Sequence, residues 1–241
     1  MSTLLGYRRI AEGIDPPYDH GAYASTHKRA PRRPPIRIAH TLSEITGPHF
    51  GAELVGDGVA DFTRFAGGEA LGERIVVTGR VLDEDGRAVS NALVEIWQAN
   101  SAGRYAHDAD QHDAPLDPHF SGVGRVAAGA AGVYRFVTIK PAAYPWKNHY
   151  NAWRPQHIHF SLFGPGFATR LITQMYFPGD PLLEFDPIYS SVPDPAVRER
   201  LVCAFDLETT IPGRALGYRF DIVLRGRGAT PLERDAEGGV R

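Results

Sequence analysis

From residue 153 to residue 163 the chain reads Trp-Arg-Pro-Gln-His-Ile-His-Phe-Ser-Leu-Phe. Polar and apolar residues alternate from His157 onward, and this alternation is typical of a half-buried β-strand. Side chains two positions apart on a strand point to the same face, so His157 and His159 project together while Ile158 and Phe160 pack on the other side. Two imidazoles side by side on a rigid strand form a candidate pair of metal ligands.

Similar short strands are expected along much of the chain. Segments rich in β-branched and aromatic residues lie at 75–81, 92–97, 132–137, 171–177 and 218–224. Asp85-Gly86 and Gly164-Pro165-Gly166 indicate turns between them. Several short strands joined by turns predict an all-β fold, an antiparallel β-sandwich with long loops.

One short helix is expected after residue 193. Asp194 can cap its first turn, and Pro195 suits the first helical position. Val197, Leu201 and Phe205 then fall four apart and predict one buried face.

The two ends of the chain carry weaker patterns. Residues 1–70 show no long amphipathic pattern and include a basic, proline-rich run at 29–35. We expect an extended N-terminal arm that is solvated, lies over a partner subunit, or supplies arginines to an anionic ligand. The glycine-rich, charged tail over 229–241 is expected to be frayed or draped on a partner. Residues 71–228 then form the β-sandwich core of a single domain spanning 1–241.

The amino-acid composition argues against several classes of function. The 28 acidic and 26 basic residues nearly balance, which argues against a general nucleic-acid binder. The single cysteine, Cys203, excludes an intrachain disulfide and a cysteine-based zinc site, and we expect it to be structural. The sequence shows neither a membrane-spanning apolar run nor the apolar stretch of a signal peptide, so no membrane contact and a cytoplasmic location are expected.

Two histidines need further ligands to complete a metal site, and carboxylates or tyrosines remain. Tyr105 and Tyr144 each follow a predicted strand, where sites are usually built. Tyrosine loses its proton only at about pH 10, so it is a poor ligand for zinc or magnesium, whereas a trivalent iron ion can remove that proton. Two histidines with two tyrosinates point to iron(III), and two histidines with one carboxylate would point to iron(II).

Several motifs in a fixed order carry a resemblance to a known family. They are Leu93–Asn100, Gly103–Tyr105, Ala114–Pro118, Thr138–Pro141, Tyr144–Trp146 and Arg154–Phe160. From about residue 43 to residue 227 the chain resembles the intradiol ring-cleavage dioxygenases, above all their iron-bearing β subunits that cleave protocatechuate. The resemblance implies a non-haem iron(III) enzyme that uses O2 to open protocatechuate, a small aromatic diol, to 3-carboxy-cis,cis-muconate in the β-ketoadipate route of aromatic degradation.

The resemblance also implies roles for individual residues. The residues that match the four ligands of one iron(III) per chain are Tyr105, Tyr144, His157 and His159. Tyr144 also matches the base that substrate displaces, and Arg154 matches an arginine that stabilises carbanion character on the ring. Trp146 and Gln174 match residues that line the pocket for substrate and oxygen. Tyr23 matches a tyrosine near the substrate carboxylate.

The same resemblance implies a partner subunit, and the chain differs from the family's usual sequence at one position. It implies a homologous α subunit that helps to wall the site in an (αβ)n hetero-oligomer. Ala142 stands where the family usually has glycine, and alanine would be strained there if the position needs a positive φ.

Two other functions fit part of the sequence. Catechol and hydroxyquinol 1,2-dioxygenases resemble this chain around the iron, but they carry a helical N-terminal region that the proline-rich residues 1–70 do not predict. A non-catalytic β-sandwich binding module resembles the strands from 77–81 through 92–96. Such modules lack the two tyrosines and the paired histidines, so these four residues discriminate between the readings.

Overall fold

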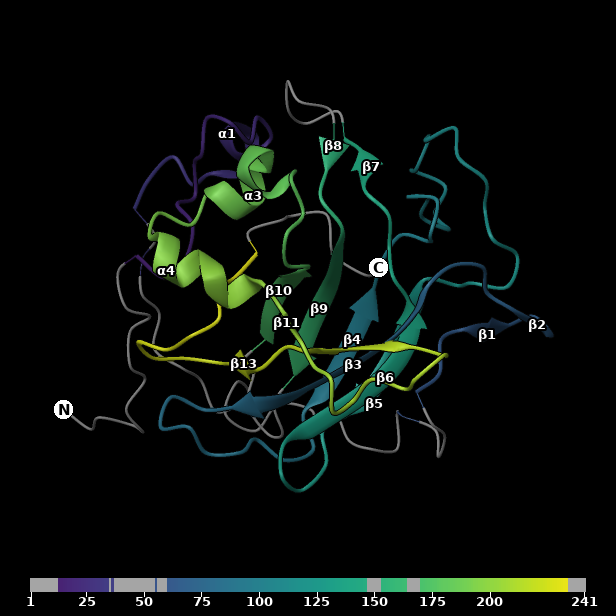
Figure 1. Ribbon diagram of the computed structural model, residues 1–241. Helices are drawn as coiled ribbons and strands as arrows, with labels where there is room; N and C mark the ends of the chain where they lie inside the picture. The colour runs from purple at the N-terminus through teal and green to yellow at the C-terminus, as the bar shows by residue number, and fades with distance from the viewer. Residues whose placement is uncertain are drawn as a thin grey trace.

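The computed structural model describes residues 13–34, 36, 55, 60–146, 153–163 and 170–233. Within these residues the chain forms a β-sandwich, which confirms the all-β prediction (Figure 1). One sheet has the strand order β10-β9-β4-β5 and is antiparallel throughout. Its strands are β4 (Leu93–Trp97), β5 (Val123–Ala127), β9 (His157–Phe163) and β10 (Arg170–Tyr176).

The second sheet is mixed. Its strands are β3 (Arg74–Leu82), β6 (Val133–Ile139), β11 (Ala204–Phe205), β12 (Leu216–Arg219) and β13 (Ile222–Val223). The central strand β3 pairs antiparallel with β6 but parallel with β12 and β13. Parallel pairing needs a crossover connection, and here the chain runs from β4 through β11 between the parallel strands β3 and β12.

The single strand expected over 218–224 is in fact two strands. β12 ends at Arg219 and β13 begins at Ile222. The backbone N–H of Arg80 donates to the Asp221 carboxylate over 2.8 Å, so a side chain takes the place of a ladder carbonyl here. Gly79 permits this close approach, because a Cβ on it would collide with the carbonyl of Phe220.

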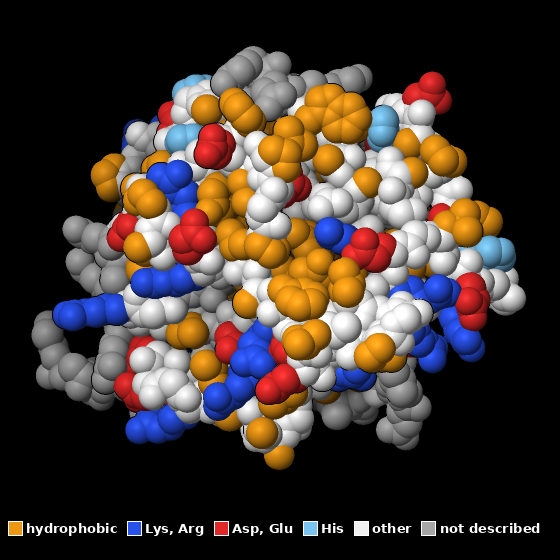
Figure 2. Space-filling view, in the orientation of Figure 1, with side chains coloured by type: hydrophobic (Ala, Val, Ile, Leu, Met, Phe, Trp, Pro, Cys, Tyr) orange, Lys and Arg blue, Asp and Glu red, His pale blue; other side chains and the backbone are white. Residues whose placement is uncertain are grey.

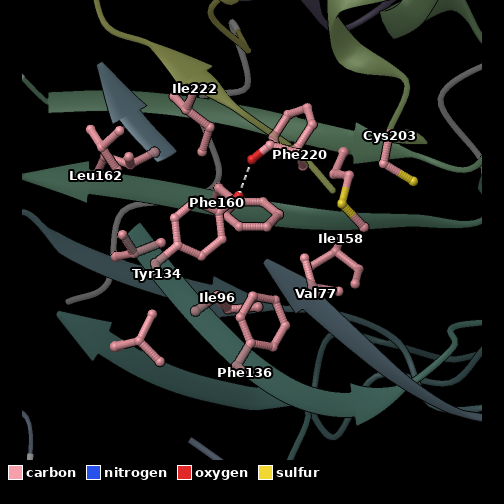
Figure 3. Packing of buried hydrophobic residues seen from close by; sticks show 14 of the residues in the cluster. Val77, Ile96, Tyr134, Phe136, Ile158, Phe160, Leu162, Cys203, Phe220 and Ile222 are labelled. Atoms are coloured by element: carbon pink, nitrogen blue, oxygen red, sulfur yellow. Dashed lines mark hydrogen bonds between the residues drawn. The ribbon is translucent and has the colours of Figure 1, made fainter. Parts of the chain in front are cut away.

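Side chains from both sheets meet in one core (Figure 3). Ile158, Phe160 and Leu162 of β9 are fully buried there, which confirms the face predicted for them. The hydroxyl of Tyr134 donates a hydrogen bond across the core to the carbonyl of Phe220. This bond satisfies a phenol in an otherwise apolar interior.

The opposite face of β9 is also buried, so the prediction of a half-exposed strand is wrong. His157 and His159 are only 2% and 6% exposed. Arg154, Glu233 and the rings of Tyr105 and Tyr144 lie against these histidines. A buried polar face needs partners for its donors and acceptors, and here it forms the candidate site.

Short helices gather at one side of the sandwich (Figure 1). The described residues contain α1 (Thr26–Arg29), α3 (Pro187–Ser190), α4 (Pro195–Arg198) and the 3-10 turns Leu183–Phe185 and Glu199–Leu201, where one helix was expected. Asp194 caps α4 as predicted, accepting from the Ala196 N–H over 2.9 Å. Phe205 does not continue the helical face: it is 52% exposed on β11, because the Cys203 N–H bonds to the Tyr176 carbonyl and draws the chain into extended structure.

Two small hairpins complete the fold. β1 (Arg64–Phe65) pairs with β2 (Gly68–Glu69), and β7 (Tyr144–Pro145) pairs with β8 (Trp153–Arg154). No helix in the described ranges has the length and apolar character needed to cross a membrane.

The arm and the start of the tail pack on this chain itself. Ile14 is buried in a cluster with Tyr189 and Ala229, and Tyr23 is 4% exposed. Residues 229–233 hydrogen-bond to neighbouring segments, so the expectation of a frayed tail is wrong for that stretch. Residues 234–241 lie outside the described ranges.

Candidate metal centre

The four predicted ligand residues lie together on the buried outer face of β9. Each of the four rings lies next to two of the others, so that the four form a closed circuit of ring contacts. The ring centroids are 5.2 Å apart for Tyr105 and Tyr144, 5.5 Å for Tyr144 and His157, 4.8 Å for His157 and His159, and 6.4 Å for His159 and Tyr105. Two nitrogen donors and two phenol oxygens are therefore gathered from three separate segments.

Asn100 fastens the Tyr105 loop, which follows β4. Its side-chain Oδ1 accepts from the backbone N–H groups of Ala102 and Arg104, each over 2.9 Å. Its backbone carbonyl accepts from Ala142 N–H, which belongs to the segment leading into Tyr144. One asparagine thus ties the loops of both tyrosines together.

Backbone geometry brings these two loops into contact. Gly103 has a φ of 76°, and a Cβ on it would strike the carbonyl of Ala143, next to Tyr144. Glycine is therefore required two residues before Tyr105. Ala142 is not among the residues with positive φ, so the strain considered for it does not arise.

Because Nδ1 of each histidine has a hydrogen-bond partner, Nε2 is the candidate metal-binding atom of both. Nδ1 of His157 lies 2.7 Å from the carbonyl of Pro155, and Nδ1 of His159 lies 3.1 Å from the Glu233 carboxylate. Burial, followed by the charge of Arg154, holds the pKa of His157 well below its usual value. The imidazole of His157 is therefore neutral, which is the form that binds metals.

Burial keeps both tyrosines protonated at neutral pH, even though the guanidinium of Arg154 lies beside Tyr144. Burial raises the pKa of Tyr105 well above its ordinary value, and proximity to Tyr144 adds to the shift. Burial also raises the pKa of Tyr144, although the charge of Arg154 opposes it. The buried Tyr105 hydroxyl has no hydrogen-bond partner in the part of the chain that the structure describes. An unsatisfied buried oxygen is costly, and a metal ion would satisfy it.

Arg154, from β8, brings a permanent positive charge to these donors. It is 1% exposed, and its Nη1 lies 3.3 Å from the Tyr144 hydroxyl and 3.0 Å from Nε2 of His157. Its Nη2 forms a 2.8 Å ion pair with Asp186, the residue that caps α3. The guanidinium is thus held beside the donor atoms of two candidate ligands.

Strands β4 and β10 flank the histidines and add further groups. Gln174 and Trp97 both stand opposite His159 in the sheet, and Tyr176 stands opposite His157. Gln174 Oε1 accepts from Arg154 Nη2 over 2.6 Å and from the Tyr176 hydroxyl over 2.8 Å. The ring of Trp97 stacks on His159 at 4.7 Å and nearly parallel.

The N-terminal arm reaches the same region. Tyr23 packs edge-on against Trp146 at 5.0 Å, and the guanidinium of Arg154 lies 5.4 Å from the Trp146 ring. Arg29 places its guanidinium over Tyr23 at 4.7 Å. The predicted pocket residues Tyr23, Trp146 and Gln174 are therefore brought together around Arg154.

Sequence reasoning missed four residues of this region: Trp97, Tyr176, Asp186 and Glu233. The pair Asp186-Pro187 carries a helix-cap signal that marks a local structure but not its link to Arg154. Trp97 and Tyr176 lie in predicted strands, but the sequence alone does not reveal which strand neighbours each of them. Glu233 lies in a stretch with no structural signal at all.

The described residues contain no group of three or more His, Cys, Asp or Glu side chains that could hold a metal ion. A β-sandwich with two phenols and two imidazoles gathered at one face is the arrangement that the resemblance to the intradiol dioxygenases implies. The chain belongs to the intradiol ring-cleavage dioxygenase family: the family model described as Dioxygenase matches residues 45–226. This family uses non-haem iron.

The N-terminal residues point to one member of this family. Residues 7–41 match the model of the protocatechuate 3,4-dioxygenase beta subunit N terminal region. The protocatechuate 3,4-dioxygenase beta chain of Burkholderia cepacia is 62% identical over 221 residues, which cover 91% of this chain and 94% of that one. The predicted resemblance and the predicted enzyme class are confirmed.

More distant relatives agree with this assignment. The protocatechuate 3,4-dioxygenase alpha chain of Pseudomonas putida is 31% identical over 205 residues, covering 80% of this chain and 95% of that one. The crystal structure of hydroxyquinol 1,2-dioxygenase from Pseudomonas putida superposes with a TM-score of 0.52 at 25% identity, covering 84% of this chain and 69% of that one.

Proposed function

We propose that this chain is the iron(III)-bearing subunit of an intradiol dioxygenase that cleaves protocatechuate with O2. The observation that carries the proposal is the closed circuit of Tyr105, Tyr144, His157 and His159. A relative named protocatechuate 3,4-dioxygenase beta chain, 62% identical over nearly the whole chain, supports the choice of substrate.

The donor set fits a hard, trivalent ion. Both tyrosines have raised pKa values, so a weakly acidic divalent ion would leave them protonated. When bound, iron(III) would supply the Lewis acidity that ionises them and that withdraws electrons from a chelated catecholate. Two phenolates would offset most of the charge of iron(III), and the imidazoles of His157 and His159 would complete the set.

Tyr144 and Arg154 are the residues we expect to act on substrate. Tyr105 and Tyr144 are both half-buried, but it is the Tyr144 hydroxyl that lies beside the guanidinium, and as a phenolate Tyr144 would take up a proton from the incoming diol. Arg154 stays charged at any working pH and would stabilise negative charge that develops on the ring. Asp186 and Gln174 fix its orientation by direct hydrogen bonds, so this charge is in place before substrate binds.

The arm favours a substrate with a carboxylate over catechol itself. Arg29 lies over Tyr23, Tyr23 packs against Trp146, and the guanidinium of Arg154 lies over the Trp146 ring. A cation and a phenol at this distance from the candidate centre suit an anionic ring substituent. Catechol and hydroxyquinol carry no such group, and the arm would add nothing to their binding.

An α-type subunit is the proposed partner in an (αβ)n assembly. The named β-chain relative and the 31% identity to α chains support a pair of homologous subunits. Phe205, Leu207, Ile211 and Leu216, around β11 and β12, are exposed by 37–75%. Figure 2 shows hydrophobic side chains gathered across the middle of the face turned to the viewer. Such exposed apolar surface is typical of a protein interface.

The proposal is tested by metal analysis and by oxygen uptake. We expect the purified protein to contain iron and to be wine-red from tyrosinate bound to iron(III). With an α-type chain it should consume O2 with protocatechuate and much more slowly with catechol. His157→Ala should lose the iron and the colour. A colourless, iron-free wild-type protein would contradict the iron centre, and faster turnover of catechol would contradict the substrate.

A further inference from the structure

A carboxylate from the far end of the chain meets one of the candidate ligands. Glu233 is 7% exposed, and its Oε2 lies 3.1 Å from Nδ1 of His159. The two residues are 74 positions apart in the sequence. A buried carboxylate in hydrogen-bond contact with an imidazole is an arrangement that orients the ring.

The main chain places Glu233 firmly. Its backbone N–H donates to the carbonyl of Ile172 over 2.7 Å. The hydroxyl of Thr173 donates to the carbonyl of Pro231 over 2.8 Å, and the N–H of Leu232 donates to Asp15 over 3.1 Å. Residues 229–233 therefore form a strap that is fixed both to β10 and to the N-terminal arm.

His159 is restrained in a second way. Trp97 stacks on its ring with centroids 4.7 Å apart and an interplanar angle of 5°. The indole sets the plane of the imidazole, and Glu233 sets which nitrogen carries the proton. With the proton on Nδ1, the lone pair of Nε2 can donate to a metal ion that Tyr105, Tyr144 and His157 also bind.

The two histidines differ in the charge of their partners. Nδ1 of His157 faces the neutral carbonyl of Pro155, whereas Nδ1 of His159 faces a carboxylate. A carboxylate partner makes an imidazole more basic and a stronger metal donor than a neutral acceptor does.

We propose that Glu233 is a positioning residue that holds His159 in its metal-binding orientation and strengthens its donation to the metal. The proposal rests on the proposed iron centre. It gives the strap at residues 229–233 a role in the metal site, in addition to its packing against β10 and the N-terminal arm. It also makes His159 the stronger donor of the two histidines.

Two substitutions separate orientation from charge. Glu233→Ala removes the acceptor. We expect this variant to bind iron about 10- to 100-fold more weakly than wild type, as measured by competition with a chelator. Glu233→Gln keeps an acceptor oxygen but no charge, so it should retain iron better than the alanine variant. In the glutamine variant we expect the tyrosinate-to-iron absorption band to shift and the iron(III)/iron(II) potential to become more positive.

Thr173→Val is the matched control. It removes one anchor of the strap at Pro231 and leaves the carboxylate beside His159. We expect a lower melting temperature but unchanged iron release, absorption band and potential. If Thr173→Val reproduces the losses of Glu233→Ala, Glu233 only anchors the strap and the inference is wrong.

The outcomes distinguish this inference from the proposed function. A wild-type protein without a ferric tyrosinate band overturns the iron centre itself. A wild-type protein with that band, and Glu233 variants identical to it in iron release, absorption and potential, overturns only the role of Glu233. Should Glu233→Ala fail to fold, the absorption band and potential of Glu233→Gln decide the question.

Discussion

The guanidinium of Arg154 and the carboxylate of Asp186 form a buried ion pair, with Nη2 2.8 Å from Oδ2 and side-chain exposures of 2% and 0%. Asp186 has a second task, since its Oδ1 accepts the Ile188 N–H over 3.0 Å and caps α3. One carboxylate thus links the cation of the site to the helical layer beside it.

Asp186→Asn separates these two tasks. Asparagine can still cap α3, but it leaves the buried charge of Arg154 without its counterion. Removing one partner of a buried pair costs about 3 to 5 kcal/mol, and we expect a loss of that size in the free energy of unfolding, measured with denaturant. The matched control is Glu69→Gln, which breaks the exposed pairs with Arg64 and Arg74 and should cost less than about 1 kcal/mol. Equal, small losses in both variants would show that Arg154 finds another counterion.

Arg154→Lys keeps the charge but loses the planar fork. A lysine ammonium cannot contact Asp186, Gln174 and Tyr144 together, as the guanidinium does. We expect kcat with protocatechuate to fall by about 10²- to 10³-fold, the loss typical of removing one preorganised electrostatic contact. Iron content should stay at the wild-type level, because Arg154 is not in the proposed ligand set. Arg219→Lys, at a partly exposed ion pair with Asp206, serves as the control and should leave kcat unchanged. Wild-type turnover in Arg154→Lys would rule out a role for the guanidinium geometry.

Cys203 should be inert in the folded protein. It is 3% exposed, and burial raises the pKa of its thiol to about 12. Only the thiolate reacts with alkylating reagents, and burial disfavours that charged form, so the reactive fraction stays minute at neutral and mildly alkaline pH. We expect no iodoacetamide adduct on the native protein by mass spectrometry at pH 8 and one adduct after unfolding in guanidinium. Rapid labelling of the native chain would show that this part of the core opens readily.

Local pattern was enough to predict the sandwich and the paired histidines of β9, whereas the resemblance to a known family was needed to assign Tyr105 and Tyr144 to the same site. The period-two alternation in β9 assigns Ile158 and Phe160 to the core, and the structure buries both. The same alternation cannot show that the histidine face is also buried, because that depends on segments distant in sequence. Arg154 meets Asp186 across 32 residues, and His159 meets Glu233 across 74. No sequence period links such positions, so the partners that orient the candidate site emerge only from the fold.

Gly103 provides the most direct test of how the backbone builds the candidate centre. Its φ of 76° disfavours any side chain, and a Cβ would also strike the carbonyl of Ala143, beside Tyr144. Gly103→Ala should therefore lower the free energy of unfolding by about 1 to 3 kcal/mol and push the Tyr105 loop away from Tyr144.

Gly213→Ala isolates the part of this effect that comes from φ alone. Gly213 has a similar φ of 68°, but nothing lies within 4 Å of a Cβ built on it. We expect it to lose about 1 kcal/mol and to keep its iron and colour. Gly103→Ala should release iron to a chelator faster than both wild type and Gly213→Ala, because its added methyl group separates two of the proposed ligands. Equal iron release in the two variants would mean that the Tyr105 loop yields without disturbing the donors, and that Gly103 serves the turn alone.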